Sequence, residues 1–462
     1  MIDSGIFRPG DKLPSIRSLH KKKGLSIGTI LQSFNHLMDK GLVVSREKSG
    51  YFVNDSPGKR LPLPKSMPAS LSESSVHIDH LLQKLLPESP NKNFVQFAYA
   101  LPDNRLLPFN SIKRAIQQTS RDISGSYLGI EAPNGNKQLR EEIAKRSLTW
   151  KGSTHADELI ITNGATEALV CCLRAVTQPG DTVLVQDPCF YGVMQILECL
   201  GLKIATVPSH PLTGISLDNV TEACKKLTIK AFMLVSNFNN PDGASIGTEG
   251  KKQLAEFANK HRIPIIEDDI YGDLFFKGSR PDTIKAYDTD GWVMYCSSFT
   301  KTLIPGFRIG WCAAGRFTYE VARIKFVHSH STSNFTQRVL LQLLGSGVYE
   351  RHLQKFRLEL HKNLNRTISI IEQYFPEGTK ITRPHGGLVI WAELPADVNA
   401  AILQEKAMEH KIAYAPGELF SSKGDYKQYI RISYCNLWEN KVEKALIKLG
   451  QLLPAVSKNS AS

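Results

Sequence analysis

Residues 297–311, SSFTKTLIPGFRIGW, begin at the end of one predicted strand (292–297) and run into the next (309–313). Lys301 stands among small hydroxyl residues, and a Pro-Gly turn and Arg308 follow it. An isolated lysine at a strand end is usually a solvated surface residue. A partly desolvated lysine with a second cation nearby has a lowered pKa, as Schiff-base chemistry requires. Ser298 and Arg308 add a hydroxyl and a guanidinium group that suit a phosphate.

From about residue 94 onward, short apolar segments alternate with amphipathic segments of helical spacing. The segments predicted as strands are 159–162, 182–185, 231–235, 263–267, 292–297 and 309–313. This alternation predicts an α/β domain with a largely parallel sheet, in which ligands bind at the carboxyl ends of the strands. From about residue 320, long helical patterns and two further strands, 387–394 and 429–434, predict a smaller α+β lobe.

An acidic segment, EDDIY at 267–271, follows one of these strands. Beside a Schiff-base lysine, it suits pyridoxal phosphate (PLP), which withdraws electrons only while a facing carboxylate keeps its ring nitrogen protonated. Asp268 and Tyr271 are close enough in sequence to serve the ring nitrogen and the 3′ oxygen respectively. Taken alone, an acidic strand end is more often a cap for the next helix.

Three more strand ends carry groups that suit the same cofactor. NGATE at 163–167 opens a helix, whose first N–H groups and the Thr166 hydroxyl suit a phosphate. DPCFY at 187–191 places aromatic rings where one can stack on the pyridine ring, and NNPDG at 239–243 offers an amide for the 3′ oxygen. Each also has a simpler interpretation, as a strand-to-helix turn, core aromatics or a β-turn.

Arg431 lies in the middle of the predicted strand YIRIS, 429–433, between apolar residues. A half-buried arginine needs an anion, and a substrate carboxylate that accepts two hydrogen bonds fits its planar group. A structural salt bridge explains the same pattern equally well.

In this order, the motifs NGATEAL, DPCFY, NNPDG, EDDIY, SSFTKTLIPGFRIGW and YIRIS resemble those of fold-type I PLP enzymes of the class I/II aminotransferase group, over residues 94–454. The resemblance implies three catalytic residues, Lys301, Asp268 and Tyr271, with Lys301 as the Schiff-base lysine and catalytic base. It further implies Asp268 on the ring nitrogen, Tyr271 and Asn240 on the 3′ oxygen, Phe190 stacked on the ring, Ala165, Thr166, Ser298 and Arg308 on the phosphate, and Arg431 on the substrate carboxylate.

Two other positions follow from this resemblance. Tyr127 matches the family tyrosine that reaches the phosphate in the partner subunit, which implies a homodimer. Ala100 stands in FAYALP, 97–102, where the family often has a glycine, so its methyl group is expected to crowd the substrate carboxylate.

The first 53 residues form a separate basic unit. Their pattern predicts a helix over 15–23 capped by Ser15, a second helix from Ser26 to Gly41, and a β-hairpin over 42–53. A basic run is usually a solvated face, but helices followed by a hairpin favour nucleic acid as its partner.

PGDKLPSIR (9–17) and KSGYFV (48–53) resemble the winged helix-turn-helix of GntR-type regulators, whose second helix enters the major groove of DNA. The resemblance implies DNA contacts from Ser15, Arg17, Ser26 and Thr29, with Arg46, Lys48 and Gly50 on the wing. Two features differ from the family: its first helix normally begins before the point that matches Met1, and Ile27 replaces an arginine that reads bases.

A winged head, a linker and an aminotransferase-like domain together resemble MocR-type regulators. The sequence predicts a DNA-binding domain over 1–53, a linker over 54–92 with an amphipathic helix near 76–86, and a PLP domain over 93–458 whose small lobe spans about 320–458. The expected function is transcription regulation through double-stranded DNA, with an amine or amino acid as effector. The alternative is a working aminotransferase; a scaffold without cofactor is disfavoured because the whole motif set is present.

Composition sets outer limits on the function. The formal net charge of +13 favours a polyanionic partner. No apolar run reaches the ~20 residues that span a bilayer, and the N-terminus lacks a signal-peptide pattern, so we expect a cytoplasmic protein with no membrane partner. The eight cysteines are scattered without metal-ligand spacing, so neither disulfides nor a metal site is expected.

Overall fold

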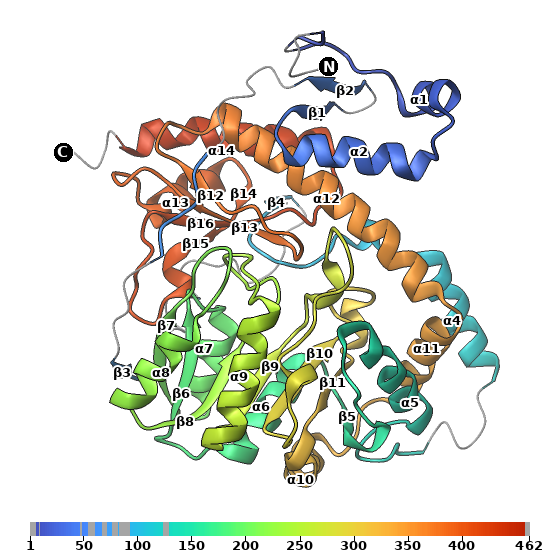
Figure 1. Ribbon diagram of the computed structural model, residues 1–462, viewed down its shortest axis with the longest axis vertical. Coiled ribbons are helices and arrows are strands. Elements are labelled where there is room, and N and C mark those ends of the chain that lie inside the picture. Colours follow the sequence, from blue (N-terminus) through green and yellow to red (C-terminus); the bar gives the residue numbers. More distant parts are fainter. Residues whose placement is uncertain are drawn as a thin grey trace.

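The computed structural model of the chain describes residues 6–8, 10–46, 49–53, 61–66, 72–75, 82, 93–122 and 129–457. Figure 1 shows a small N-terminal head above a large α/β body. Among the described residues, the body holds an eight-stranded sheet, a four-stranded sheet and a two-stranded pair. A long helix, α12 (Val348–Tyr374), runs from the large sheet's layer of helices up to the head.

The head consists of α1 (Ile16–Lys23), α2 (Ile27–Asp39) and a hairpin of β1 (Val43–Arg46) and β2 (Gly50–Val53), as the sequence predicted. The hydroxyl groups of Ser15 and Ser26 cap the two helices by accepting backbone N–H bonds. Apolar side chains at helical and alternating spacing meet between the helices and the hairpin. They form a small core of Leu13, Ile30, Phe34, Met38, Val43 and Val53.

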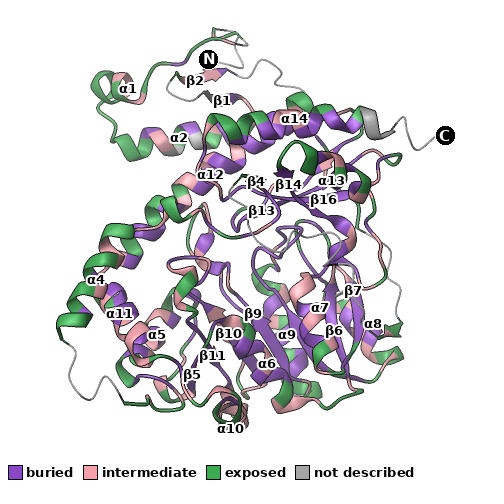
Figure 2. Cartoon of the chain, turned by 180° about the vertical axis from the view of Figure 1, so that it is seen from behind, coloured by how far each residue is buried: buried purple, intermediate pink, exposed green. Residues whose placement is uncertain are grey.

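The large sheet has the strand order β3-β7-β6-β8-β9-β10-β11-β5. Strands β7, β6, β8, β9 and β10 run parallel to one another, whereas β3 pairs antiparallel with β7, and β11 pairs antiparallel with both β10 and β5. Their bounds are β3 (Glu73–Ser74), β5 (Leu159–Thr162), β6 (Thr182–Asp187), β7 (Lys203–Pro208), β8 (Ile229–Leu234), β9 (Ile265–Asp268), β10 (Val293–Ser298) and β11 (Gly310–Ala313). The mostly parallel α/β fold is therefore confirmed, and the strands are buried because helices cover the sheet (Figure 2).

The helices of this layered region each bury one apolar face. In α6, for example, Ala168, Leu169 and Cys172 are buried against the sheet. The helices are α4 (Phe109–Arg121), α5 (Lys137–Arg146), α6 (Ala165–Val176), α7 (Tyr191–Cys199), α8 (Leu217–Lys226), α9 (Thr248–His261), α10 (Thr318–Ser329) and α11 (Asn334–Gly345). Helix α10 packs on α6, and α11 packs on α4 and α5.

The second sheet is antiparallel, with the strand order β12-β13-β16-β15. It is covered by α13 (Ala400–Glu409) and α14 (Asn440–Ser457), while β14 (Ile412–Ala413) pairs in parallel with β4 (Val95–Gln96). The strands of the sheet are β12 (Lys380–Ile381), β13 (Val389–Glu393), β15 (Ala415–Pro416) and β16 (Tyr429–Ser433). The two strands expected near 387–394 and 429–434 are thus β13 and β16.

The described residues between the head and the body are bound to the body. The Pro62 carbonyl accepts the N–H of Ile381, and the Lys65 N–H is bonded to Glu393 at 3.0 Å. Strand β3 extends the large sheet, where Glu73 forms an ion pair with Lys203 at 2.9 Å. The helix expected near 76–86 lies almost wholly outside the described residues.

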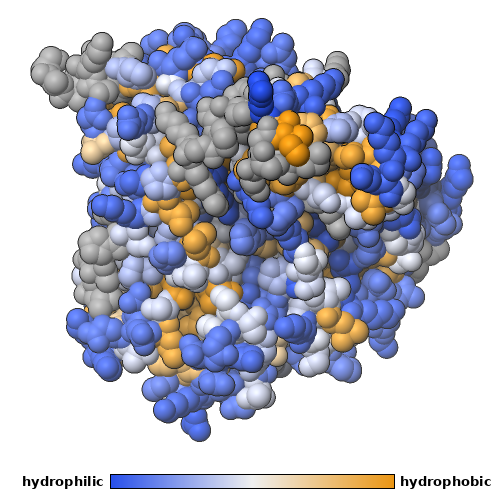
Figure 3. Space-filling model, turned by 45° about the horizontal axis from the view of Figure 1, so that its top comes forward, coloured by the Kyte–Doolittle hydropathy of each residue, from blue (hydrophilic) through white to orange (hydrophobic). Residues whose placement is uncertain are grey.

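Hydrophilic residues cover most of the described surface on the side of the head, with hydrophobic residues in small groups between them (Figure 3). Within the described parts of the chain, no helix combines the length and the apolar composition that crossing a membrane demands.

Candidate functional site

Lys301 lies in the turn after β10, at the carboxyl end of the parallel strands. Its Nζ donates a hydrogen bond to the carbonyl oxygen of Ala100 at 3.0 Å. Burial lowers the pKa of Lys301 to about 8; Arg431 and Arg308 act in the same direction, whereas Cys435 and Asp268 oppose the shift. A lysine with this pKa has a substantial neutral fraction near pH 7.5, and the neutral amine is the form that attacks a carbonyl group.

Asp268 ends β9, the strand next to β10, and is paired in register with Cys296. Its carboxylate is buried, and Oδ1 has no hydrogen-bond partner among the described residues. Burial and the neighbouring Asp269 raise the pKa of Asp268 to about 7, against the effect of Lys301. A buried acceptor without a partner is costly, so this oxygen suits an N–H donor supplied by a ligand.

Tyr271 and Asn240 meet on the same side of the site. The Asn240 amide Nδ2 donates to the Tyr271 hydroxyl at 3.4 Å, and both side chains are buried. Desolvation raises the pKa of the Tyr271 hydroxyl, which therefore stays protonated and can act as a hydrogen-bond donor.

The start of α6 and Arg308 together form a cradle for an anion. Gly164 precedes α6 with φ 83°, and a Cβ there would lie only 2.5 Å from Nη2 of Arg308. Arg308 itself has a φ of 51°, an uncommon conformation for a residue with a side chain, and donates to Thr300 Oγ1 at 3.3 Å. The guanidinium group thus lies against the first turn of α6, where backbone N–H groups are unpaired.

The other residues predicted for the phosphate lie around this cradle. Ala165 and Thr166 are the first residues of α6, and the Thr166 side chain is exposed. Ser298 is buried at the end of β10 and is paired in register with Gly310, whose backbone packs against Gly164.

Arg431 is fully buried in β16, more deeply than the half-buried position expected from the sequence. Its Nη1 donates to Asn240 Oδ1 at 3.2 Å and its Nη2 donates to the Ala98 carbonyl oxygen, while Nε has no partner among the described residues. Within the described chain no carboxylate lies within ion-pair distance of Arg431. A structural salt bridge therefore does not account for this cation, and a ligand carboxylate can.

Two aromatic residues lie at the start of α7, one of them next to Arg431. Phe190 is partly buried, and its ring centroid lies 4.4 Å from that of Tyr191. Tyr191 was not singled out from the sequence, although DPCFY contains it, and its side chain is hydrogen-bonded to Arg431. Cys435 was also missed: its buried thiol is close enough to interact electrostatically with Lys301, a proximity with no signal in the local sequence. Tyr127 lies outside the described residues.

These residues fit PLP: an unpartnered buried carboxylate oxygen for its ring N–H, a cationic cradle for its phosphate, and an amine of lowered pKa. Lys301, Asp268, Tyr271, Asn240 and Arg308 would hold it. When bound, the cofactor supplies an electron sink for bonds at the carbon that carries a ligand amino group. Among the described residues, no three His, Cys, Asp or Glu side chains are grouped to hold a metal ion.

In the head, the predicted DNA-facing residues lie on the exposed sides of α1 and α2. Arg17 is exposed on α1, and the hydroxyl groups of Ser26 and Thr29 lie 2.8 Å apart at the start of α2. Ser15 is exposed as the cap of α1, and Gly50 has a φ of 105° in the hairpin. Lys48 and the side chain of Arg46 lie outside what the structure describes.

Comparison with known proteins agrees with this division of the chain. Residues 96–449 match the family model "Aminotransferase class I and II", and residues 1–53 match "Bacterial regulatory proteins, gntR family". The uncharacterized HTH-type transcriptional regulator YdcR of Escherichia coli K12 is 36% identical, with 98% of this chain and 96% of YdcR aligned. YjiR of the same strain, also an uncharacterized HTH-type transcriptional regulator, is 34% identical over 97% of this chain and 96% of its own.

Solved structures similar to this chain include aminotransferases. Kynurenine aminotransferase from Pyrococcus horikoshii, in complex with PMP, has a TM-score of 0.75 at 27% identity, covering 84% of this chain and 95% of that one. The multiple substrate aminotransferase of Thermococcus profundus has a TM-score of 0.75 at 25% identity, over 85% and 96%. The chain therefore belongs to the class I and II aminotransferase family and, within it, to the MocR-type proteins that carry a GntR-family head.

Proposed function

We propose that the protein is a PLP-binding transcription regulator whose aminotransferase-like domain senses an amine or amino acid. One observation carries the proposal: a winged head with its basic helix exposed and a PLP site with its main positions filled occur in one chain. Proteins named as HTH-type transcriptional regulators align with this chain over nearly its full length.

The chemistry of the site supports an amino acid as the effector. Lys301, with its lowered pKa, can exchange its place on a carbonyl carbon with another amine. The buried Arg431 lacks a carboxylate partner among the described residues and would bind the carboxylate of that ligand. A ligand with both groups would satisfy both residues at once.

We further propose a cytoplasmic homodimer that binds double-stranded operator DNA. All eight cysteines are unpaired thiols, as expected in a reducing compartment. The position of Tyr127 in the sequence supports a site completed by a second copy. The exposed α1 has basic residues in its last turn and no acidic residue in its first, which suits a phosphate backbone.

DNA binding can be tested on the duplex upstream of the chain's own gene, by fluorescence anisotropy over a range of salt concentrations. We expect saturable binding that weakens with salt, and Arg17→Ala should weaken it and reduce the salt slope by about 1. Lys137→Ala, at an exposed lysine on α5, serves as the matched control. Absence of binding by the parent protein, or no change in Arg17→Ala, would contradict the proposal.

An active aminotransferase is the second candidate, favoured by the complete set of site residues around Lys301. It predicts that an amino group passes from an amino acid to a 2-oxo acid, with loss of the reaction in Lys301→Ala. The measurement is the yield of the new amino acid under multiple turnover. Retention of an amino acid in the site without transfer would favour the sensor instead.

A further inference from the structure

Helix α12 touches both functional regions of the molecule. It begins beside the turn that holds Lys301 and continues until it packs against α2 and β1 of the head (Figure 1). Its 27 residues form one continuous helix. At 1.5 Å per residue, Tyr349 and Arg366 on this helix are about 26 Å apart along the axis.

The first turns of α12 are bonded to Thr302, the residue that follows Lys301. The Tyr349 hydroxyl lies 2.8 Å from Thr302 Oγ1, and His352 Nε2 donates to the Thr302 carbonyl oxygen at 2.9 Å. Thr302, Tyr349 and His352 are all buried. Because breaking a buried hydrogen bond leaves costly unpaired groups, we expect the start of α12 to move together with the Lys301 turn.

A second set of contacts joins α12 to the segment that follows Tyr271. The Tyr349 hydroxyl donates to Asp273 Oδ2 at 2.8 Å, and Arg357 Nε donates to the Asp273 carbonyl oxygen at 2.8 Å. The Arg357 guanidinium also lies 3.9 Å from the ring centroid of Phe275. Helix α12 therefore touches the chain next to two of the residues that surround the cofactor position.

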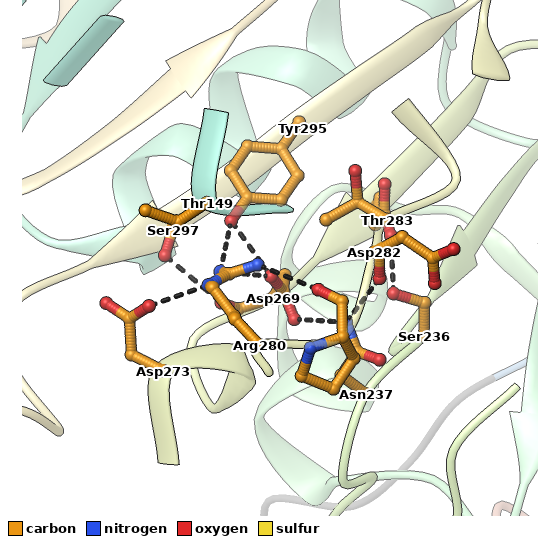
Figure 4. A network of polar contacts seen from close by, with 12 residues as sticks. Thr149, Ser236, Asn237, Asp269, Asp273, Arg280, Asp282, Thr283, Tyr295 and Ser297 are labelled. Carbon is orange, nitrogen blue, oxygen red and sulfur yellow. Dashed lines mark hydrogen bonds and ion pairs between the residues drawn. The ribbon is translucent and has the colours of Figure 1, made fainter. Parts of the chain in front are cut away.

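Asp273 in turn belongs to a buried polar network under the site (Figure 4). Arg280 pairs with Asp273 at 2.6 Å and with Asp269 at 2.7 Å, and the Tyr295 hydroxyl donates to Asp269 at 2.9 Å. Asp269 directly follows Asp268. The network therefore connects the chain that follows Asp268 with the first turns of α12.

Toward its other end, α12 packs against α2 and β1 of the head, and it carries Arg366. This arginine lies close enough to Tyr51 of β2 to interact with its hydroxyl electrostatically, and it also lies 5.4 Å from the ring centroid of Trp438. The ring of Tyr51 stacks on Phe34 of α2 with centroids 4.2 Å apart. The charge of Arg366 therefore acts on a ring that packs directly on α2, the helix expected to enter the DNA groove.

We infer that α12 is the element through which occupancy of the Lys301 site alters DNA binding by the head, with Tyr349 and His352 as positioning residues for the Lys301 turn. The inference rests on the proposed function and adds the structural element that connects the Lys301 site with the DNA-binding head. A ligand that displaces the Lys301 amine changes the contacts of the Lys301 turn, and the bonded helix carries that change to Tyr51 and α2. A coupling between sites is reciprocal, so DNA should alter ligand affinity by the same factor.

The test uses the full chain loaded with PLP, with aminooxyacetate as the probe of the site. Its amino group replaces the Lys301 amine at the cofactor's carbonyl carbon, which releases Lys301 as a free amine, and its carboxylate suits Arg431. DNA affinity is measured by anisotropy with and without the probe. We expect the parent's affinity to change about fivefold or more, a typical size for allosteric coupling.

Two variants interrupt the route at its two ends. Tyr349→Phe removes one hydroxyl group near Lys301, and Arg366→Gln removes the charge near Tyr51; each should reduce the response to less than about twofold. Gln354→Ala, at an exposed position of α12 between them, should respond as the parent does. Hydrogen exchange of α2 amides without DNA gives a second readout, and the probe should change it in the parent only.

The outcomes separate the two proposals. If the parent does not bind DNA, the proposed function fails and the inference falls with it. If the parent binds DNA but the probe changes neither affinity nor exchange in α2, or if both variants respond like the parent, DNA binding stands and the role of α12 is overturned. Loss of the response in both variants with an intact control supports the inference.

Discussion

The cofactor site and the DNA-binding head differ in how they present their functional side chains: the site encloses them, whereas the head exposes them to solvent. Lys301, Asp268 and Arg431 come from three strands or strand ends and are enclosed, so their protonation and contacts are set by neighbours far away in the sequence. In the head, Arg17 and Thr29 are exposed on short helices supported by six buried apolar side chains. Chemistry at the first region depends on desolvation, whereas binding at the second depends on charge displayed to solvent.

The sharpest way to separate the two regions is Lys301→Ala. We expect the visible absorption band of lysine-bound PLP to disappear completely, because Lys301 is the amine whose pKa is lowered by burial within the site, where Asp268, Arg308 and Arg431 act on it electrostatically. DNA binding without effector should persist, since the head does not depend on the amine for folding. Lys355→Ala, an exposed lysine on α12, is the control and should keep the band.

The reverse separation is Phe34→Ala. Phe34 is buried in the core of the head and stacks on Tyr51, so its truncation should destabilise the head by about 3 to 5 kcal/mol. A core of this size provides too little free energy of folding to remain stable after such a loss. DNA binding should therefore vanish, while the absorption band stays unchanged. Leu25→Ala, at a half-exposed position outside this core, should change neither readout. Loss of the band in Phe34→Ala would show that the body depends on the head.

The lowered pKa of Lys301 predicts how the site loads with pH. Only the neutral amine reacts, so a pKa of about 8 instead of 10.5 raises the reactive fraction at pH 7.5 by roughly 200-fold. The rate at which the PLP band forms in the cofactor-free protein should therefore rise with pH and reach half its maximum near pH 8. Asp268→Asn removes a carboxylate that favours the ammonium form, which should move the midpoint to lower pH. A parent midpoint above pH 10 would contradict the desolvated site.

Arg431→Gln tests whether the ligand carboxylate binds where the structure leaves a buried guanidinium without an acidic partner. Losing hydrogen bonds to a charged group costs about 1.5 to 3 kcal/mol, so affinity for an amino acid should fall by roughly 10- to 150-fold. Affinity for the amine that lacks only the carboxylate should change little, and spectral titration measures both. Equal losses for the two ligands would indicate a general disruption of the site.

The smallest expected effect concerns the head alone. Ile27 is half exposed at the start of α2, where the resemblance to GntR-type heads implies an arginine. Ile27→Arg adds a cation and a donor next to the expected groove, so DNA affinity should rise by about threefold to tenfold and the salt slope should steepen by about 1. Lys137→Ala is again the control, because it changes the net charge of the protein outside the head. Unchanged affinity would place this end of α2 away from DNA.

The sequence predicted the elements whose signals are local. The six expected strands of the large sheet all formed, and the caps at Ser15 and Ser26 began the helices of the head as expected. Strand β7 was not predicted, although it pairs with β6 along its whole length. Its Ile204, Thr206 and Val207 favour a strand, so the local pattern was present but was not used.

The site divides in the same way. The residue types at strand ends indicated Lys301, Asp268 and Arg308, because each motif carries its own turn chemistry. The contacts that enclose Arg431 come from Asn240 and Ala98, more than 100 residues away, and no local pattern predicts them. The unpartnered oxygen of Asp268 likewise depends on how neighbouring strands pack around it. The full set of contacts along α12 is likewise visible only in three dimensions.

Because residues 61–66 contact the second sheet, only the residues between Val53 and Leu61 connect the head to the body without described contacts. From Val53, the last residue of β2, to Leu61, eight residue steps can span at most about 28 Å, whatever path they take. The head therefore stays within that radius of the body, although 39 residues separate the predicted domains in sequence. In a dimer, the relative position of the two bodies would therefore determine the spacing between the two DNA half-sites of the operator.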